Sequence, residues 1–340
     1  MTARGRCLLS CGAAAMIVRF PFLAVAAALA FSPRPGWAQE VVRLANMKFA
    51  HYGAVAYMKE LAPRFNLRIE ERIFAKGVDI IPAIVAGEID AAASGAEAAI
   101  AGRASGAPIY VVAGFARGGV RILAQPGAGI RTITQLKGKR VGVTRGGTQE
   151  LLLLAQLQKH GLTWSDRPGK DVRLVYLPYP DLNQALWARQ LDAICQSEPQ
   201  SSQAINQKFG VEIIKPYDTP VGEPVRTLVI TERLYRDRRA VAERFLKLFV
   251  TATRLFQRDP ALAQSYVRDK LFKGQLSSQD FQDAMNNAAY TVDITTAGVA
   301  ATTELMQRFG VGRMARPPRA EDWVKLDLLA RAKAEVPDRP

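Results

Sequence analysis

Two stretches of this chain share one outline. Residues Gly87–Glu97 read GEIDAAASGAE, and residues Arg189–Pro199, about 100 positions later, read RQLDAICQSEP. Each contains the tail of a helix, a polar turn that ends in aspartate, a short apolar strand and a polar cluster with one carboxylate. Any two strand–helix units share some of this outline, but the repeat favours two similar lobes that face a shared cleft. Ligands of open α/β sheets bind at the carboxyl ends of the strands, and small-molecule sites concentrate between domains.

The first 38 residues have the pattern of a secretory signal peptide. They contain four arginines and no acidic residue, then the apolar run Pro21–Phe31 of 11 residues, then Gly36-Trp37-Ala38 with small residues at the expected cut. The apolar run is too short to cross a membrane. We therefore expect residues 1–38 to be removed on export, with translation starting at Met1 or at Met16.

The composition is that of a globular protein. The chain has 340 residues, of which 49% are hydrophobic, and this length allows two domains with large cores. Without the leader one cysteine remains, Cys195, so no intramolecular disulfide can form, and a free thiol is usually buried and inert. Loss of the leader lowers the net charge from +15 to +11, which weakly favours an anionic ligand. No nucleic-acid-binding motif accompanies the positive charge.

Strands and helices alternate at the spacing typical of a parallel sheet. Strands are expected at 41–46, 67–74, 89–93, 109–115, 120–125, 140–144, 172–176, 191–195, 211–214 and 227–231. Helices are expected at 54–65, 77–86, 96–104, 134–136, 149–160, 181–188, 238–259, 260–270, 278–290, 295–309 and 320–334. The predicted organisation is a signal peptide (1–38), a first lobe (39–122 plus 225–340) and a second lobe (123–224). Two crossovers would form a hinge that allows closure around a ligand.

The segment Val141–Thr148 (VGVTRGGT) is the most specific local feature. It reads as a strand, a glycine turn and the start of a helix, and the free N–H groups at a helix start favour an anion. The lysine of a phosphate-binding loop and the glycine spacing of a dinucleotide-binding turn are both missing. An ordinary strand–helix turn also uses glycine, so a purely structural role stays open.

Other polar and aromatic residues follow predicted strands or flank the crossovers. Glu97 and Glu198 could cap helices, pair with a cation or recognise a ligand ammonium. Arg117, Arg121 or Arg226 could bind a carboxylate or sulfonate in a bidentate manner, and a role at the hinge or in solvent is an equal alternative for each. The candidate ligand-binding residues are Lys48, Phe49, His51, Tyr52, Ser94, Gly95, Glu97, Phe115, Gly147, Thr148, Gln149, Glu198 and Arg226.

Signals of an enzyme are few. The chain has two histidines, His51 and His160, no metal-ligand cluster and no nucleophile-elbow motif. A pairing of Cys195 with His51 would need the fold to bring them together. The sequence therefore predicts a binding protein with no catalytic residue, metal or cofactor.

Several segments of the chain resemble the corresponding segments of the periplasmic solute-binding proteins of ABC importers for nitrate, taurine and aliphatic sulfonates. The same superfamily includes proteins that bind the pyrimidine precursor of thiamine. The matching segments are 84–90 (IVAGEID), 94–97 (SGAE), 106–109 (GAPI), 133–143 (ITQLKGKRVGV), 177–178 (LP), and 191–193 (LDA) through 198–199 (EP). The resemblance implies the type II binding-protein fold, an α/β fold with two Rossmann-like lobes, a hinge and C-terminal helices on the first lobe.

The resemblance also implies a function and a site. The protein would be the periplasmic, monomeric solute-binding component of an ABC importer, with an inner-membrane permease and its ATPase as partners. By position, the family's cleft clusters correspond to Lys48–Tyr52, to Ser94 and Glu97, to Gly147–Gln149 and to Glu198. Relatives often carry threonine-glycine-aspartate where this chain has SGAE, and an aromatic residue where it has Gln200.

These departures leave the ligand open. The alternatives are a sulfonate, taurine, nitrate, an aromatic carboxylate, or a vitamin precursor of the pyrimidine or riboflavin type. An enzyme on the same fold that uses Cys195, or a sensor without a transporter, would be a different class of protein.

Overall fold

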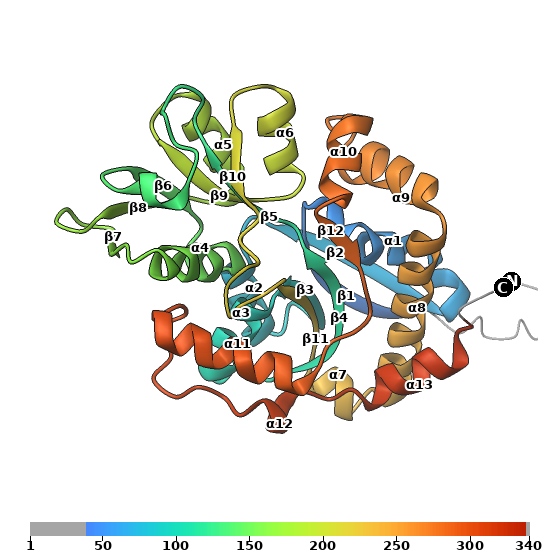
Figure 1. Cartoon of the computed structure of the whole chain (residues 1–340). Coiled ribbons are helices and arrows are strands. Elements are labelled where there is room, and N and C mark those ends of the chain that lie inside the picture. Colours follow the sequence, from blue (N-terminus) through green and yellow to red (C-terminus); the bar gives the residue numbers. More distant parts are fainter. Residues whose placement is uncertain (1–38, 338–340) are drawn as a thin grey trace, which may run out of the picture. The chain divides into compact units, whose positions relative to one another are not determined.

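Two six-stranded sheets carry the fold of residues 39–337, which are the residues that the computed structural model describes (Figure 1). The predicted signal peptide, residues 1–38, lies outside them. Sheet 1 contains, in spatial order, β12 (Ala288–Tyr290), β4 (Ile109–Gly118), β11 (Val225–Thr231), β3 (Ala91–Gly95), β1 (Glu40–Met47) and β2 (Leu67–Phe74). Sheet 2 contains β10 (Val211–Ile214), β5 (Val120–Ala124), β9 (Ala193–Ser197), β6 (Arg140–Val143), β8 (Val172–Tyr176) and β7 (Trp164–Ser165).

Both sheets follow the same plan. In each, the strand of the repeat lies between one parallel and one antiparallel neighbour: β3 between β1 and β11, and β9 between β6 and β5. The chain crosses from one sheet to the other immediately before β5 and before β11. These two strands begin at the edge of the sheet where the parallel strands end, and they therefore run antiparallel to them. The prediction of parallel sheets is therefore wrong for β5, β11 and the edge strand β12.

The crossovers lie close to the predicted positions. The chain leaves sheet 1 after β4 and enters sheet 2 at Val120, and it returns to sheet 1 at Val225. The predicted boundary between residues 122 and 123 falls inside β5, a strand of sheet 2. Gly118 and Gly119, at the first crossover, have φ angles of 70° and 78°, a conformation that glycine adopts without strain.

Helices cover the sheets and form the C-terminal region. Their bounds are α1 Gly53–Leu61, α2 Ile80–Val85, α3 Ala96–Ala104, α4 Thr148–Lys159, α5 Tyr179–Trp187, α6 Gln200–Asn206, α7 Glu232–Arg236, α8 Arg239–Arg258, α9 Pro260–Tyr266, α10 Ser278–Met285, α11 Thr296–Phe309, α12 Ala320–Trp323 and α13 Asp327–Glu335. In the C-terminal region α8 packs against α1, α13 packs against α8 and β4, and α11 contacts α3. None of the described helices is long and apolar enough to span a bilayer.

Two predicted helices are wrong in part because tertiary contacts interrupt them. The segment 278–290 ends as a helix at Met285, and Ala288–Tyr290 pairs with β4 instead. The segment 320–334 breaks between α12 and α13, where Lys325 donates its backbone N–H to the carbonyl of Val111 in β4. Helix α6, helix α7 and strand β7 were not predicted from the sequence.

The repeated aspartate has the same structural role in both sheets. Asp90 accepts hydrogen bonds from the backbone N–H and the guanidinium of Arg43 in β1 at 2.8–3.0 Å. Asp192 accepts the equivalent bonds from Arg140 in β6 at 2.7–3.2 Å. Each aspartate thereby ties the start of its strand to the neighbouring strand. The arginine partners hold the pKa of both carboxyl groups below the usual value, against the opposing effect of burial.

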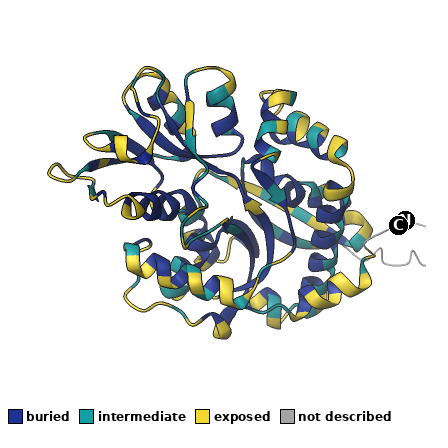
Figure 2. Ribbon diagram, in the orientation of Figure 1, coloured by how far each residue is buried: buried dark blue, intermediate teal, exposed yellow. Residues whose placement is uncertain are grey.

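The core consists of the two sheets and the helix faces that cover them. Figure 2 shows that the strands are mostly buried, whereas α11 and α13 alternate between buried and exposed residues. The strand residues that carry this core are alanines and branched aliphatic residues: β3 contributes three alanines, and β1 contributes Val42 and Leu44. Polar residues follow the strands at their carboxyl ends.

Replacing either aspartate by asparagine should destabilise the protein, because a charge-assisted network is lost. We expect a loss of about 2 kcal/mol for Asp90→Asn, whose side chain is 3% exposed and also binds Arg233, and about 1 kcal/mol for the more exposed Asp192→Asn. Both pKa values are lowered by folding, so the stabilisation is present above the ordinary carboxyl pKa, about 4, and is lost as the pH falls through the folded-state value. Urea unfolding at pH 7 and pH 3 measures this, with exposed Asp181→Asn as the control. Equal losses at both pH values would contradict the assignment.

Candidate functional site

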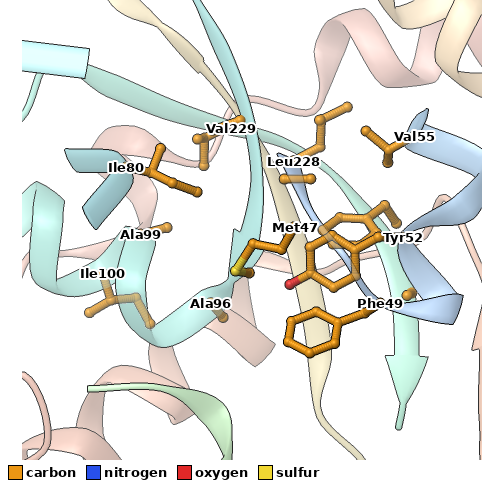
Figure 3. Packing of buried hydrophobic residues seen from close by; sticks show 14 of the residues in the cluster. Met47, Phe49, Tyr52, Val55, Ile80, Ala96, Ala99, Ile100, Leu228 and Val229 are labelled. Atoms are coloured by element: carbon orange, nitrogen blue, oxygen red, sulfur yellow. The ribbon is translucent and has the colours of Figure 1, made fainter. Parts of the chain in front are cut away.

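One cavity is lined by the ends of strands from both sheets, and we call it the central cavity. Its lining from the sheet 1 side is Met47, Phe49, Tyr52, Lys76, Gly77, Val78, Gly95, Ala98 and Arg226, and from the sheet 2 side it is Thr144, Arg145, Gly146, Gly147, Thr148, Gln149, Tyr179 and Ser197. Figure 3 shows the rings of Phe49 and Tyr52 side by side, with the Met47 side chain extending beside them toward Ala96. The cavity leaves only about 20 Å³ in which the centre of a water molecule could lie. This is room for one or two waters, so side chains nearly fill it.

A buried arginine faces this cavity. Arg226, near the start of β11, is 2% exposed, and among residues 39–337 its two terminal nitrogens, Nη1 and Nη2, make no hydrogen bond of ordinary geometry, although its charge acts on the nearby Tyr52 hydroxyl and Glu97 carboxyl. A buried charge without a partner is costly, so such groups are normally paired. Because β11 runs antiparallel to β3, this start of the strand lies beside Gly95, at the carboxyl end of β3. The arrangement offers a two-pronged donor to an anion.

The start of α4 forms the opposite wall. Helix α4 has 12 residues, and the first N–H groups of a helix have no partner within it. The side chain of Glu150 accepts the backbone N–H of Gly146 at 2.5 Å and so fixes the turn. Tyr179 donates its hydroxyl to Gln149 Oε1 at 2.6 Å, and a Cβ atom on Gly147 would lie 2.3 Å from that hydroxyl oxygen. Glycine is therefore required at Gly147 by the close approach of Tyr179.

One hydrogen bond joins the two walls. Thr148, the first residue of α4, donates its hydroxyl to Glu97 Oε2 at 2.6 Å, and both side chains are buried. Burial raises the pKa of the Glu97 carboxyl, an effect that the Thr148 hydroxyl and the nearby charge of Arg226 oppose. The threonine hydroxyl that the sequence assigns to a ligand is thus bonded to a side chain of the protein in this conformation.

The predicted ligand-binding residues divide into two groups. Those that line the central cavity are Phe49, Tyr52, Gly95, Gly147, Thr148, Gln149 and Arg226. Those that do not line it are Lys48, His51, Ser94, Glu97, Phe115 and Glu198. Glu97 still touches the first group through Thr148.

Glu198 is occupied elsewhere. Its carboxylate accepts hydrogen bonds from Arg121 Nε at 2.5 Å, Asn287 Nδ2 at 3.0 Å and the Ser202 hydroxyl at 2.8 Å. The reason lies in the register of the repeat, because counting from Asp90 and Asp192 places Glu198 opposite Ala96 and not opposite Glu97. Arg121, another candidate for an anion, is therefore committed to an ion pair at the first crossover.

The other residues outside the cavity support its walls. His51 is fully buried, and a Cβ atom on Gly119 would lie 2.9 Å from its ring. Burial, with a smaller effect of Arg226, lowers the pKa of His51 well below its usual value, so its ring is neutral. Phe115 packs edge-on against Tyr52, with ring centroids 4.6 Å apart. Ser94 donates to the carbonyl of Gly95 at 3.2 Å.

Several lining residues were absent from the prediction. Lys76 and Gly77 follow β2, Tyr179 begins α5 shortly after β8, and Ser197 is the last residue of β9. All of them obey the rule that sites form at the carboxyl ends of strands, so applying that rule to every strand would have found them. Within residues 39–337, no group of three or more histidine, cysteine, aspartate or glutamate side chains could hold a metal ion.

Arg226→Met should stabilise the ligand-free protein, because it removes a buried charge whose terminal nitrogens have no hydrogen-bond partner within residues 39–337, and it keeps most of the side-chain volume. We expect the free energy of unfolding to rise by about 1–3 kcal/mol. Urea unfolding measures this, with Arg117→Met as the control because Arg117 is exposed on β4. A loss of stability in Arg226→Met alone would mean that the guanidinium is satisfied within the protein.

Comparisons with known proteins agree on one family. A protein of Brachyspira hyodysenteriae, named as an ABC transporter periplasmic binding protein, is 23% identical over 238 residues, which are 65% of this chain and 67% of that protein. A binding protein of Brucella abortus is 28% identical over 181 residues, and the chain spans only 54% of its length. The solved alkanesulfonate-binding protein SsuA of Xanthomonas axonopodis pv. citri, bound to MOPS, shares the fold with a TM-score of 0.71 at 20% identity, over 84% of this chain and 98% of that one.

These findings confirm the resemblance and the fold class inferred from the sequence. The NMT1-like family matches residues 27–268, which is more than half of the chain. The chain belongs to the NMT1-like family and has the fold of the periplasmic binding proteins of ABC importers.

Proposed function

We propose that the protein is the solute-binding component of an ABC importer and captures a small organic anion in the central cavity. The observation that carries this proposal is Arg226, whose terminal nitrogens are buried and have no partner among the described residues. An anionic solute would supply the missing acceptors. The names of the relatives support the transport role, since they include an ABC transporter periplasmic binding protein and an alkanesulfonate-binding protein.

The proposed binding groups surround one small volume. Arg226 binds the anion in a bidentate manner, and the N–H groups at the start of α4 face it from the other wall. Tyr52 and Phe49 cover the organic part of the solute. Gly95, Gly147, Thr148 and Gln149 complete the walls. Lys48 lines the neighbouring cavity, and His51, Ser94, Phe115 and Glu198 support the loops and the hinge that position the walls.

Binding requires the two sheets to move apart and close again. The central cavity leaves about 20 Å³ for water centres, so a solute cannot enter without this motion. We propose that the moving bodies are the two predicted lobes, residues 39–122 plus 225–340 and residues 123–224, with Gly118, Gly119 and Val225 at the crossovers. The hydrogen bond between Glu97 and Thr148 must break when the cavity opens.

The location and partners follow from the same proposal. The leader predicts export, so the protein would work in the periplasm as a monomer and deliver its solute to an inner-membrane permease that an ATPase drives. A sensor without a transporter would bind the same solute. These two roles can be distinguished by comparing growth on that solute with and without the transporter genes.

An enzyme that uses Cys195 is less well supported. Cys195 lies in β9 and is fully buried, and burial raises the pKa of its thiol, which disfavours the reactive thiolate. A neutral pyrimidine or riboflavin-type precursor is also less well supported, because it would bring no anionic acceptor to the terminal nitrogens of Arg226.

Small anions should raise the melting temperature of the protein, and Arg226→Met should abolish this effect. The panel holds methanesulfonate, taurine, nitrate, benzoate and benzenesulfonate, with riboflavin and a neutral pyrimidine as alternatives. A solute at one hundred times its dissociation constant stabilises by about 2.7 kcal/mol. The measurement is a thermal shift on protein that has been unfolded and refolded to remove any bound solute.

Arg226→Lys is the matched variant for this panel. It keeps the charge but loses the two-pronged donor, so we expect weaker binding of every anion and not a complete loss. A shift that survives unchanged in Arg226→Met would place the anion elsewhere. A shift produced only by the neutral pyrimidine or riboflavin would replace the proposed solute with a vitamin precursor.

A further inference from the structure

A second and larger cavity adjoins the central cavity, and we call it the vestibule. The centre of a water molecule could occupy about 300 Å³ of the vestibule. For comparison, an engineered apolar cavity of about 150 Å³ binds benzene. Its apolar lining is dominated by the rings of Phe49, Phe74, Tyr179 and Phe272. Rings supply large apolar contact areas and stack on one another, so this lining suits a planar aromatic group.

The two cavities share part of their lining. Met47, Phe49 and Tyr179 line both cavities. Phe49 follows β1 of sheet 1, Tyr179 begins α5 on the sheet 2 side, and their rings meet edge-on with centroids 5.2 Å apart. Separation of the two sheets would therefore part these rings and join the cavities into one.

Amide side chains and Lys48, whose ammonium lies 5.0 Å from the centre of the Phe272 ring, also line the vestibule. Asn183 is satisfied, since it donates to the carbonyl of Gln200 at 2.9 Å and accepts from Gln196 at 3.2 Å. Gln200 donates to the carbonyl of Lys48, but its Oε1 atom is buried and has no partner among the described residues. Once the sheets separate, a hydroxyl or amino group on a bound ring could reach and satisfy this acceptor.

We infer that the solute is an aromatic acid, with its acidic group at Arg226 and its ring, bearing a hydrogen-bond donor, in the vestibule. This inference rests on the proposed function and narrows it to one class of solute. The central cavity is large enough for an acidic group only, and the adjoining vestibule offers aromatic surface and one free acceptor.

The test compares acids that differ only in the body of the molecule. Titration calorimetry of the protein should show benzoate and benzenesulfonate binding roughly tenfold or more tighter than acetate and methanesulfonate. At least one hydroxybenzoate isomer should bind tighter than benzoate, because it satisfies Gln200. Cyclohexanecarboxylate separates stacking from simple apolar contact and should bind more weakly than benzoate.

A pair of variants on one strand locates the ring. Phe74, at the end of β2, is half-buried and lines the vestibule only, so Phe74→Ala should weaken benzoate binding several-fold and leave methanesulfonate unchanged. Its neighbour Ile73 is 47% exposed and lines neither cavity, so Ile73→Ala should change nothing.

Each outcome decides the inference. Equal affinity for aromatic and small acids, or an equal effect of Phe74→Ala on benzoate and methanesulfonate, would overturn the inference and leave the proposed function standing. Equal binding of benzoate and all three hydroxybenzoates would overturn the role of Gln200. If no anion of either set binds and the purified protein carries no solute, both the inference and the proposed function fail.

Discussion

The proposed site depends on one constraint, the buried guanidinium of Arg226, whose terminal nitrogens have no hydrogen-bond partner within the described residues. Arg226 sits where β11 returns to sheet 1, beside the carboxyl end of β3 and across from the start of α4. Burial of this charge lowers the stability of the folded protein, and an aliphatic side chain at the same position would lower it less. Such costs are typical of functional sites, because the compensating group comes from outside the chain.

The two crossovers explain how such a site can be both closed and accessible. Glu97 and Thr148 join the walls at the centre, while Glu198 and Arg121 hold the first crossover together through a buried ion pair with a 2.5 Å contact. The first pair consists of one neutral hydroxyl and one carboxylate, and the second is a full ion pair with further donors around it. Opening should therefore break the Glu97 contact and spare the Glu198 network, which makes the crossover a natural pivot.

The sequence predicted the fold better than the site. The repeated aspartates predicted two matching sheets because each performs the same task, tying its strand to an arginine of the neighbouring strand. Ala288–Tyr290 was predicted as helix because alanine favours helices, and pairing with β4 overrode that preference. At the site, Gly147 and Thr148 were identified because a helix start after a strand has an intrinsic preference for anions.

The sequence could not show which candidate side chains face the cavity, because that depends on strand register. Three arginines near the crossovers were equal candidates, but Arg117 is exposed, Arg121 is paired and only Arg226 points into the cavity. Glu198 follows its strand one position earlier than Glu97 does, and the sequence did not show that this turns its side chain toward the crossover. The most direct test of the central claim is a crystal structure of the protein with the acid that raises its melting temperature most. We expect the acidic group to lie within hydrogen-bond distance of Arg226 Nη1 and Nη2. An acid bound elsewhere, with Arg226 paired to Glu97, would contradict it.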